Sequence, residues 1–153
     1  ISYFLYIKKL YYRCMKISEN FTLEELIYSK TATSNKIDNT PSEFEIINMK
    51  YFAEKLLEPI REEFGAYTPT STYRCKKLNK IVGGAKTSMH LYGYAADISF
   101  GKIKNKELFE YIKNNLEFTE LINEYPDENG CPKWVHVSIV KNRENEKKVK
   151  VIK

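Results

Sequence analysis

The stretch Ser88-Met89-His90-Leu91-Tyr92-Gly93-Tyr94-Ala95-Ala96-Asp97 decides how this chain is interpreted. It holds one of only two histidines in the sequence, and a carboxylate follows that histidine by seven residues. The other histidine lies in the alternating apolar run Trp134-Val135-His136-Val137-Ser138, a pattern typical of a half-buried strand. Two imidazoles and one carboxylate leave a fourth position open, as at catalytic zinc sites. The sequence therefore predicts a metal site made by His90, Asp97 and His136.

The composition is that of one globular domain. The chain has 153 residues, 42% hydrophobic and 29% charged, and a chain of this length can bury a core without disulfides. Its three cysteines, Cys14, Cys75 and Cys131, form no Cys-x-x-Cys pair, so neither a disulfide framework nor a cysteine-bound zinc is expected. This cysteine usage indicates synthesis in a reducing compartment. The net charge of +5 suits an anionic partner such as nucleic acid, a membrane surface or a wall polymer.

A capping box predicts the first helix of the domain. In Thr22-Leu23-Glu24-Glu25 the threonine can cap an early N–H while Glu25 reaches back, which predicts a short helix over residues 23–29. Phe21 and Leu26 are spaced as a hydrophobic staple. The polar, turn-rich residues 29–39 are expected to form a loop.

A second box, Thr40-Pro41-Ser42-Glu43, predicts the start of a long helix with proline at its first position. Apolar residues then recur at helical spacing: Met49, Phe52, Leu56, Ile60 and Phe64. We expect Pro59 to bend this helix and Gly65 to end it.

The second half of the chain combines strands with one more helix. Residues 94–100 are predicted as a strand, 105–115 as a helix, and 118–125 with 134–140 as a hairpin. The whole pattern indicates an α+β fold, with helices packed on a small, mainly antiparallel sheet.

Both ends of the chain are expected to lie outside the domain, which we assign to residues 15–141. Residues 1–14 are rich in aromatics and cations, but they match no signal peptide and are too short to span a membrane. We expect an extension or a disordered arm, with Met15 as the natural start; a membrane-surface helix is the alternative. Residues 142–153 are expected to be a frayed, charged tail. No stable membrane anchor is predicted, and synthesis is expected in the cytoplasm without a signal peptide.

Four separated motifs, in this order, carry a family resemblance: Ser71-Thr72-Tyr73-Arg74, Leu78 to Ala85, Ser88 to Asp97, and Trp134 to Ser138. Together they resemble the D-alanyl-D-alanine carboxypeptidase family of zinc peptidases, which includes phage endolysins and shares its fold with the hedgehog domain. The resemblance implies zinc held by His90, Asp97 and His136. It also implies that the substrates are peptidoglycan stem peptides and that the protein acts at the bacterial cell wall.

Two further residues acquire roles from the same resemblance. Arg74 matches the arginine that clamps a substrate carboxylate or a developing oxyanion, a role that suits a planar guanidinium. This chain departs from the family by having Thr72 where glycine is common and Cys75 where serine is usual. Ser88 is expected to bind substrate or orient a ligand, with a simple turn cap as the other possibility.

The general base is the point at which this chain departs most from its relatives. They carry an acid three residues before the last histidine, where this chain has Lys133. A protonated lysine cannot accept a proton, so we assign the base to Glu124, in Leu-Ile-Asn-Glu. Glu124 lies on the same face of the sheet as His136 only if the hairpin pairs even-numbered residues of one strand with even-numbered residues of the other. Asp127 and Glu128, on the connecting turn, are the alternatives.

These features are compatible with three functions to different degrees. Hydrolysis of stem peptides, by a monomer, is the expected one, and the lack of an export signal favours an endolysin-like cut over trimming of terminal D-alanine. A zinc-binding wall-recognition module without activity is the alternative that Lys133 supports. Nucleic-acid binding is disfavoured, because the basic residues form no clustered stripe.

Overall fold

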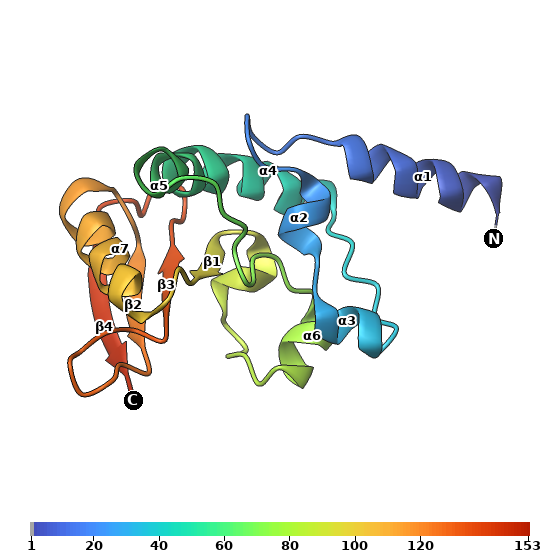
Figure 1. The fold of residues 1–153 in the computed structure, drawn as a ribbon. Helices are drawn as coiled ribbons and strands as arrows, with labels where there is room; N and C mark the ends of the chain where they lie inside the picture. The colour runs from blue at the N-terminus through green and yellow to red at the C-terminus, as the bar shows by residue number, and fades with distance from the viewer. Residues whose placement is uncertain (1) are drawn as a thin grey trace.

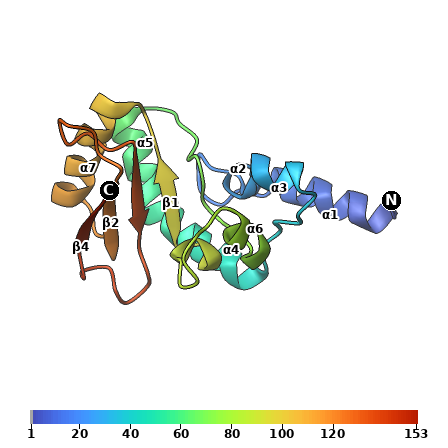
Figure 2. The same ribbon diagram turned by 90° about the horizontal axis from the view of Figure 1, so that it is seen from below.

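The fold consists of helices packed against one face of a four-stranded sheet (Figures 1 and 2). The computed structural model describes residues 2–153 of the chain. The elements are, in order, α1 (Tyr3–Cys14), α2 (Leu23–Ile27), α3 (Lys30–Ser34), α4 (Glu43–Phe52), the π-helical turn η1 (Ala53–Leu57), α5 (Glu58–Phe64), α6 (Lys76–Ile81), the 3₁₀ helix η2 (Met89–Tyr92), β1 (Ala95–Ile98), α7 (Lys102–Asn115), β2 (Glu120–Glu124), β3 (Trp134–Ser138) and β4 (Lys148–Ile152). This architecture confirms the predicted α+β class.

The sheet separates the hydrophobic core from the face that remains open. Its strand order is β1-β3-β2-β4, with β3 antiparallel to both β1 and β2, and β4 parallel to β2. Successive side chains of a strand point to opposite faces. The core face carries Ala96, Leu121, Val135 and Val137, which are fully buried with side chains of α4, α5 and α7 in one cluster. The opposite face carries Asp97 and His136.

The first capping box forms as predicted, and the second is displaced by two residues. Glu25 N–H donates to Thr22 Oγ1 at 3.3 Å, and Thr22 N–H donates to Glu25 Oε2 at 2.8 Å. The helix ends at Ile27, two residues earlier than expected. The long helix is capped by Ser42 and Glu45 instead of Thr40 and Glu43. Both pairs have the same spacing, so local sequence does not distinguish them.

The long helix is continuous from α4 to α5 but contains a π-helical turn. Pro59 has no N–H and cannot donate to the carbonyl four residues before it. The turn directly before it is wider, and Glu58 N–H donates to Ala53 O, five residues back. The distortion caused by Pro59 therefore lies in η1. The helix ends at Gly65 with φ of 87°, as predicted.

Two short α-helices were not expected from the sequence. α3 lies inside the segment predicted as a loop, where Ser29 Oγ accepts a hydrogen bond from Ala32 N–H at 3.2 Å. α6 follows Cys75 and holds the buried residue Leu78. Both helices are too short to show a clear helical period in the sequence.

Both ends of the chain are more regular than predicted. Residues 3–14, expected to be an extension or a disordered arm with a helix as the alternative, form α1, with Ser2 as its N-cap. The tail expected to fray contains β4, where Lys148 N–H donates to Thr119 O at 3.0 Å and Tyr125 N–H donates to Ile152 O at 2.7 Å. An exposed edge strand is stabilised mainly by backbone pairing, so none of its five residues needs to be buried. The functional limits of the domain remain a prediction. In residues 2–153, no helix has the length and apolar character to cross a membrane.

Candidate metal centre

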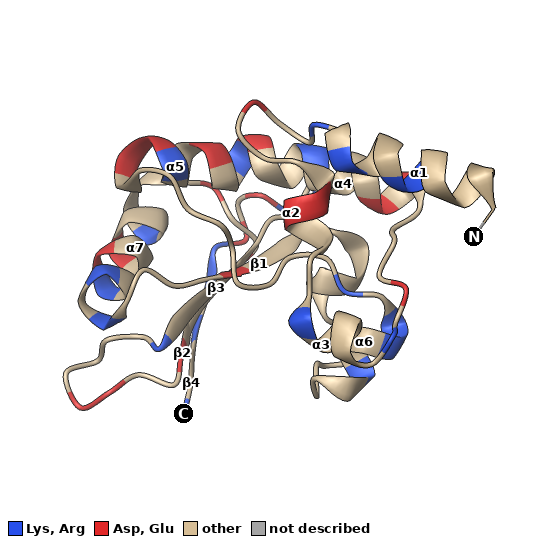
Figure 3. Ribbon diagram, turned by 45° about the vertical axis from the view of Figure 1, so that its right-hand side comes forward, with Lys and Arg blue, Asp and Glu red and all other residues tan. Residues whose placement is uncertain are grey.

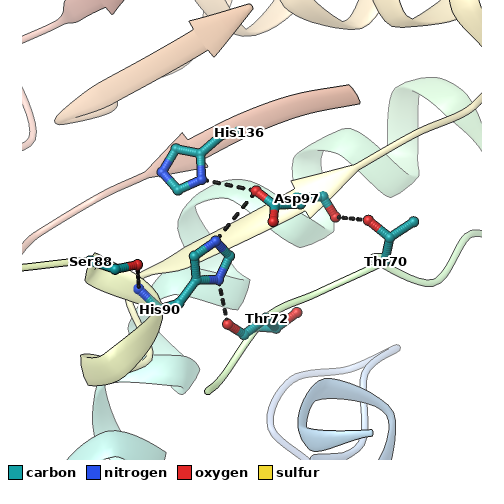
Figure 4. Close-up of polar contacts among 6 residues, drawn as sticks. All are labelled: Thr70, Thr72, Ser88, His90, Asp97 and His136. Carbon is teal, nitrogen blue, oxygen red and sulfur yellow. Dashed lines mark hydrogen bonds and ion pairs between the residues drawn. The ribbon is translucent and has the colours of Figure 1, made fainter. Parts of the chain in front are cut away.

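Three side chains from separate elements meet on the open face of the sheet (Figure 4). His90 belongs to η2, Asp97 to β1 and His136 to β3. Asp97 Oδ1 lies 2.9 Å from His136 Nδ1 and 3.3 Å from His90 Nε2. One donor atom of each residue lies within 4.8 Å of those of the other two. The fold thus brings together the residues singled out in the sequence as metal ligands.

The register of the sheet positions two of these residues. Asp97 and His136 are direct partners in the antiparallel β1–β3 pair, so both side chains point to the same face. The outer edge of β1 is held by the segment before α6. Asp97 N–H donates to Ser71 O at 2.8 Å, and Thr70 N–H donates to Asp97 O at 2.9 Å. The Thr70 hydroxyl also donates to Asp97 O, at 3.0 Å (Figure 4). Both backbone hydrogen-bonding groups of Asp97 are therefore held by this segment.

His90 is oriented by its second ring nitrogen. Nδ1 lies 2.6 Å from Thr72 O, and because a carbonyl oxygen can only accept, Nδ1 carries the proton. Nε2 then presents its lone pair toward Asp97. Burial lowers the pKa of His90, against the opposing effect of the Asp97 carboxylate. A neutral ring whose far nitrogen is fixed by a carbonyl is typical of a metal-binding histidine.

Two residues shape the turn that carries His90. Ser88 Oγ accepts a hydrogen bond from His90 N–H at 3.3 Å, so Ser88 caps η2. Gly93 ends η2 with φ of 78°, and a Cβ there would lie 2.7 Å from the backbone oxygen of Glu45 in α4. Only glycine combines this backbone conformation with such a close approach. Packing of the turn against α4 therefore fixes the position of His90.

The donor set fits a zinc ion. When His90 is neutral, its Nε2 and Asp97 Oδ1 are both acceptors, yet they face each other at 3.3 Å. A shared cation makes this contact favourable. Tetrahedral zinc with bonds of about 2.0–2.1 Å places its ligand atoms roughly 3.3 Å apart, close to the two distances observed. Burial alone would raise the pKa of Asp97, but the two imidazoles hold it well below its ordinary value. The carboxylate is therefore ionised, as a zinc ligand must be.

The three residues line a cleft of about 710 Å³. One wall is formed by the segment from Val82 to His90, and the other by β2, β4 and Arg143. Between these walls, Trp134, His136 and Ser138 line the cleft from β3. Sites of roughly 300–1,000 Å³ accommodate small ligands, so this cleft has room for a short peptide segment.

Arg74 lies in this cleft with part of its hydrogen-bonding capacity unused. The backbone N–H of Arg74 donates to His90 O at 3.1 Å, which connects this segment to η2. Its side-chain Nε is buried and, among residues 2–153, has no hydrogen-bond partner. Burial lowers the pKa of Arg74, against the opposing effect of Asp97, and a guanidinium remains charged in proteins. A buried donor without a partner is costly in a folded protein unless it serves a ligand.

Glu124 lies in the same cleft, on the same side of the sheet as His136. The β2–β3 register pairs Ile122 with His136 and Glu124 with Trp134, so even-numbered residues of the two strands are partners. Glu124 and His136 therefore point to the same face, and both line the cleft. This is the register on which the assignment of Glu124 depended. Burial raises the pKa of Glu124, Asp97 and Glu120 raise it further, and His136 opposes them. A raised pKa makes the carboxylate a stronger base.

Lys133 and the two alternative acids, Asp127 and Glu128, lie elsewhere. Lys133 is not among the described residues that line the cleft, and its Nζ lies over the Trp134 ring, 5.7 Å from the centroid. Asp127 accepts hydrogen bonds from the N–H groups of Asn129 and Cys131, which stabilise the turn and lower its pKa. Glu128 is exposed on that turn. Neither acid lines the cleft in the described part of the chain.

Sequence reasoning missed several residues of the cleft. Ser138 lies two residues beyond His136 on β3, and its Oγ is buried with no partner in the described chain. The strand alternation that singled out His136 also indicates Ser138. Lys148, Lys150 and Ile152 face the cleft from β4, which was predicted to be a frayed tail. The alternation Lys-Val-Lys-Val-Ile was the signal that could have identified this strand.

Comparison with curated proteins finds no match to the chain. Comparison with protein families agrees with the geometry of the site. A family model described as peptidase M15 matches residues 19–138, the segment that contains Arg74, Glu124 and the three converging residues. Because this match covers more than half of the sequence, the chain belongs to the peptidase M15 family, whose members resemble D-alanyl-D-alanine carboxypeptidase.

Proposed function

We propose that this protein is a zinc-dependent peptidase that hydrolyses the stem peptides of peptidoglycan. Membership of the peptidase M15 family supports cleavage of a peptide bond, and the His90, Asp97 and His136 donor set supports zinc. The resemblance to D-alanyl-D-alanine carboxypeptidases supports the choice of substrate. In this proposal the protein acts as a monomer at the bacterial cell wall.

Each residue of the cleft has a role in this reaction. His90, Asp97 and His136 would hold the zinc ion, which when bound would polarise the scissile carbonyl and lower the pKa of a water molecule to roughly 7. Thr72 O keeps the proton on Nδ1 of His90, which leaves Nε2 free as a ligand. Glu124 accepts the proton of the attacking water and later donates it to the leaving amine.

Arg74 supplies positive charge to the substrate in this proposal. Its guanidinium pairs with the developing oxyanion or with a substrate carboxylate, and the buried Nε is available for this contact. Ser88 lines the same wall of the cleft as His90, so a contact with substrate is possible in addition to its capping role.

The proposal depends most on one observation: Glu124 and His136 share one face of the sheet and one cleft. A base on the opposite face would be separated from the reacting water by the sheet itself. This register supports an active peptidase over a recognition module without activity, because the feature that favoured the module was Lys133, which lies outside the cleft.

Digestion of purified sacculi tests the proposal. The products are identified by mass spectrometry, with the protein supplied as prepared, after chelation, and after chelation followed by added zinc. We expect new amino groups or released D-alanine with the untreated protein, none after chelation, and recovery with zinc.

The mass of the products distinguishes the two possible reactions. Release of D-alanine alone identifies a carboxypeptidase, and shortened stems with new internal termini identify an endopeptidase. Binding to sacculi without any product, in protein shown by elemental analysis to contain stoichiometric zinc, would refute the peptidase and favour the recognition module.

We do not propose nucleic acid as a partner of this protein, in spite of its net positive charge. Acidic and basic residues are interspersed along α4, α5 and α7 (Figure 3). A nucleic-acid site needs a basic surface that follows the phosphate backbone. The absence of a salt-dependent shift with DNA or RNA is the expected result.

A further inference from the structure

Helix α1 presents an apolar stripe that the rest of the domain does not cover. Its residues Tyr3, Phe4, Ile7, Leu10, Tyr11 and Cys14 recur at spacings of three and four, which places them on one side of a helix. Tyr3, Phe4 and Tyr11 are 80%, 75% and 64% exposed. In both ribbon views α1 extends away from the body of the molecule (Figures 1 and 2).

Most of the stripe faces away from the domain, although Leu10 also lines a groove between α1 and the segment from α2 to Ser42. Residues of a helix are separated by about 100° around its axis, so Tyr12 lies roughly 140° from Ile7, the residue at the centre of the stripe. Tyr12 is partly buried against the core cluster. On the domain side, Arg13 Nε lies 3.1 Å from Glu24 Oε1 of α2. The helix thus contacts the domain near its C-terminal end, through Tyr12 and Arg13, and leaves the aromatic residues of the stripe exposed.

Cations lie along both edges of the stripe. Lys8 and Arg13 lie about 100–120° to either side of Ile7, and α1 contains no acidic residue (Figure 3). The Arg13–Glu24 pair is more than half exposed at both ends, so it holds Arg13 only weakly. Long cationic side chains at the edges of an apolar helix face can reach the phosphates of a membrane while their stems remain on the apolar surface.

We propose that α1 lies in the surface of an anionic phospholipid membrane, with the stripe toward the acyl chains and the domain on the aqueous side. Tyrosine suits this position, because its ring is apolar and its hydroxyl remains in the headgroup layer. The combination of an aromatic face with flanking cations and no acid matches surface-binding helices, which lie parallel to the membrane. Such binding is reversible, and it does not depend on the proposed peptidase activity.

Flotation of the full chain with lipid vesicles tests this proposal. We expect the protein to float with vesicles of phosphatidylglycerol and phosphatidylcholine, to bind pure phosphatidylcholine more weakly, and to lose affinity as salt rises. The variant Phe4→Gln/Ile7→Gln/Tyr11→Gln is expected to lose affinity for anionic vesicles by a factor of at least about ten, because each change removes an apolar side chain from the bilayer. Lys8→Gln/Arg13→Gln is expected to reduce the preference for anionic lipid.

Matched substitutions elsewhere on the surface provide the controls. Phe44, Ile47 and Ile103 are exposed apolar residues of α4 and α7, so Phe44→Gln/Ile47→Gln/Ile103→Gln should leave vesicle binding unchanged. Lys104→Gln/Lys113→Gln on α7 is the control for charge. Circular dichroism of each variant confirms that it is folded.

Three results would overturn the proposal. The first is a parent protein that does not float with anionic vesicles. The second is a control triple variant that loses as much affinity as the stripe variant. The third is a dimer in lipid-free sedimentation that the stripe variant abolishes, since a second copy of the chain would then cover the stripe.

Discussion

Glu124 shows how position, and not residue type, makes a carboxylate a candidate base. The chain has many acids, but among the described residues Glu124 is the acid on β2 that combines a raised pKa with the same cleft as the three converging residues. Its neighbour along the strand, Glu120, forms an ion pair with Lys150 of β4. The Glu120 carboxylate is therefore engaged with β4, whereas no ion pair of Glu124 is found in the described residues.

Replacing Glu124 with glutamine should abolish catalysis and leave the metal site intact. Glutamine keeps the shape of the side chain but cannot accept the proton, so we expect kcat to fall by about 10²–10⁴-fold. Zinc content by elemental analysis should be unchanged, because Glu124 is not a proposed ligand. Glu128→Gln, on the exposed turn, is the matched control. Full activity of a zinc-loaded Glu124→Gln protein would rule out Glu124 as the base.

Arg74 should not be replaceable by lysine. Lysine keeps the charge but lacks the planar fork and the buried Nε, so we expect kcat/KM to fall about tenfold to a hundredfold, the value of one or two charge-assisted hydrogen bonds. Steady-state kinetics on a stem-peptide substrate measure the loss. Arg13→Lys, on α1, should change nothing. Equal activity of Arg74→Lys and parent would show that only charge is required at this position.

At the scale of the element, the turn that carries His90 depends on its contact with α4. Gly93→Ala places a Cβ 2.7 Å from Glu45 O on a backbone with φ of 78°. We expect a loss of about 2–4 kcal/mol in the free energy of unfolding, measured by denaturant titration. Gly130 has a similar φ of 74° but open space around its Cβ, so Gly130→Ala isolates the backbone contribution at about 1 kcal/mol. Equal losses in the two variants would mean that the contact with α4 is unimportant.

Strand β4 forms part of the cleft although it lies beyond the residues that match the family model. It pairs with β2 in a register that places Lys150 beside Ile122 and Ile152 beside Glu124. Deleting residues 148–153 should raise KM roughly tenfold with a smaller effect on kcat, because the strand lines the substrate cleft and holds none of the proposed reacting groups. Circular dichroism checks that the shortened protein is folded. An unchanged KM would show that substrate does not contact β4.

At the scale of the whole molecule, the metal-free protein should lose stability as pH falls. Burial lowers the pKa of His90 from its ordinary value of 6.5, so the unfolded chain takes up this proton first. The free energy of unfolding is therefore highest above about pH 6.5 and decreases as pH falls toward the folded pKa. The pKa of Asp97 is lowered as well, so its contribution is lost only in stronger acid, below its ordinary 3.8.

Urea denaturation in the presence of a chelator, at pH values from 8 to 5, measures this dependence. The His90→Gln protein lacks the titrating group and should show a flatter profile between pH 6.5 and 5. A parent protein whose stability rises over this interval would contradict the pKa direction assigned to His90.

Much of the local structure could be predicted from the sequence. The Thr22 and Glu25 capping box, the end of the long helix at Gly65 and the alternation of the hairpin strands each depend on neighbours within a few residues. Other features could not be predicted. Thr40 with Glu43 and Ser42 with Glu45 are equally good boxes. The alternation of residues 148–152 indicates a strand, but it does not indicate that this strand pairs with β2, which is remote in the sequence.

The candidate site divides in the same way. The residue types of the site can be identified from the sequence: two histidines, an aspartate, an arginine and a choice of acids, because ligand and base chemistry belongs to the side chain. Folding is needed to bring His90, Asp97 and His136 together, to place Glu124 in their cleft and to add β4 to its wall. The reason is physical: strand register and the packing of η2 against α4 are set by contacts between remote segments, and no local pattern specifies these.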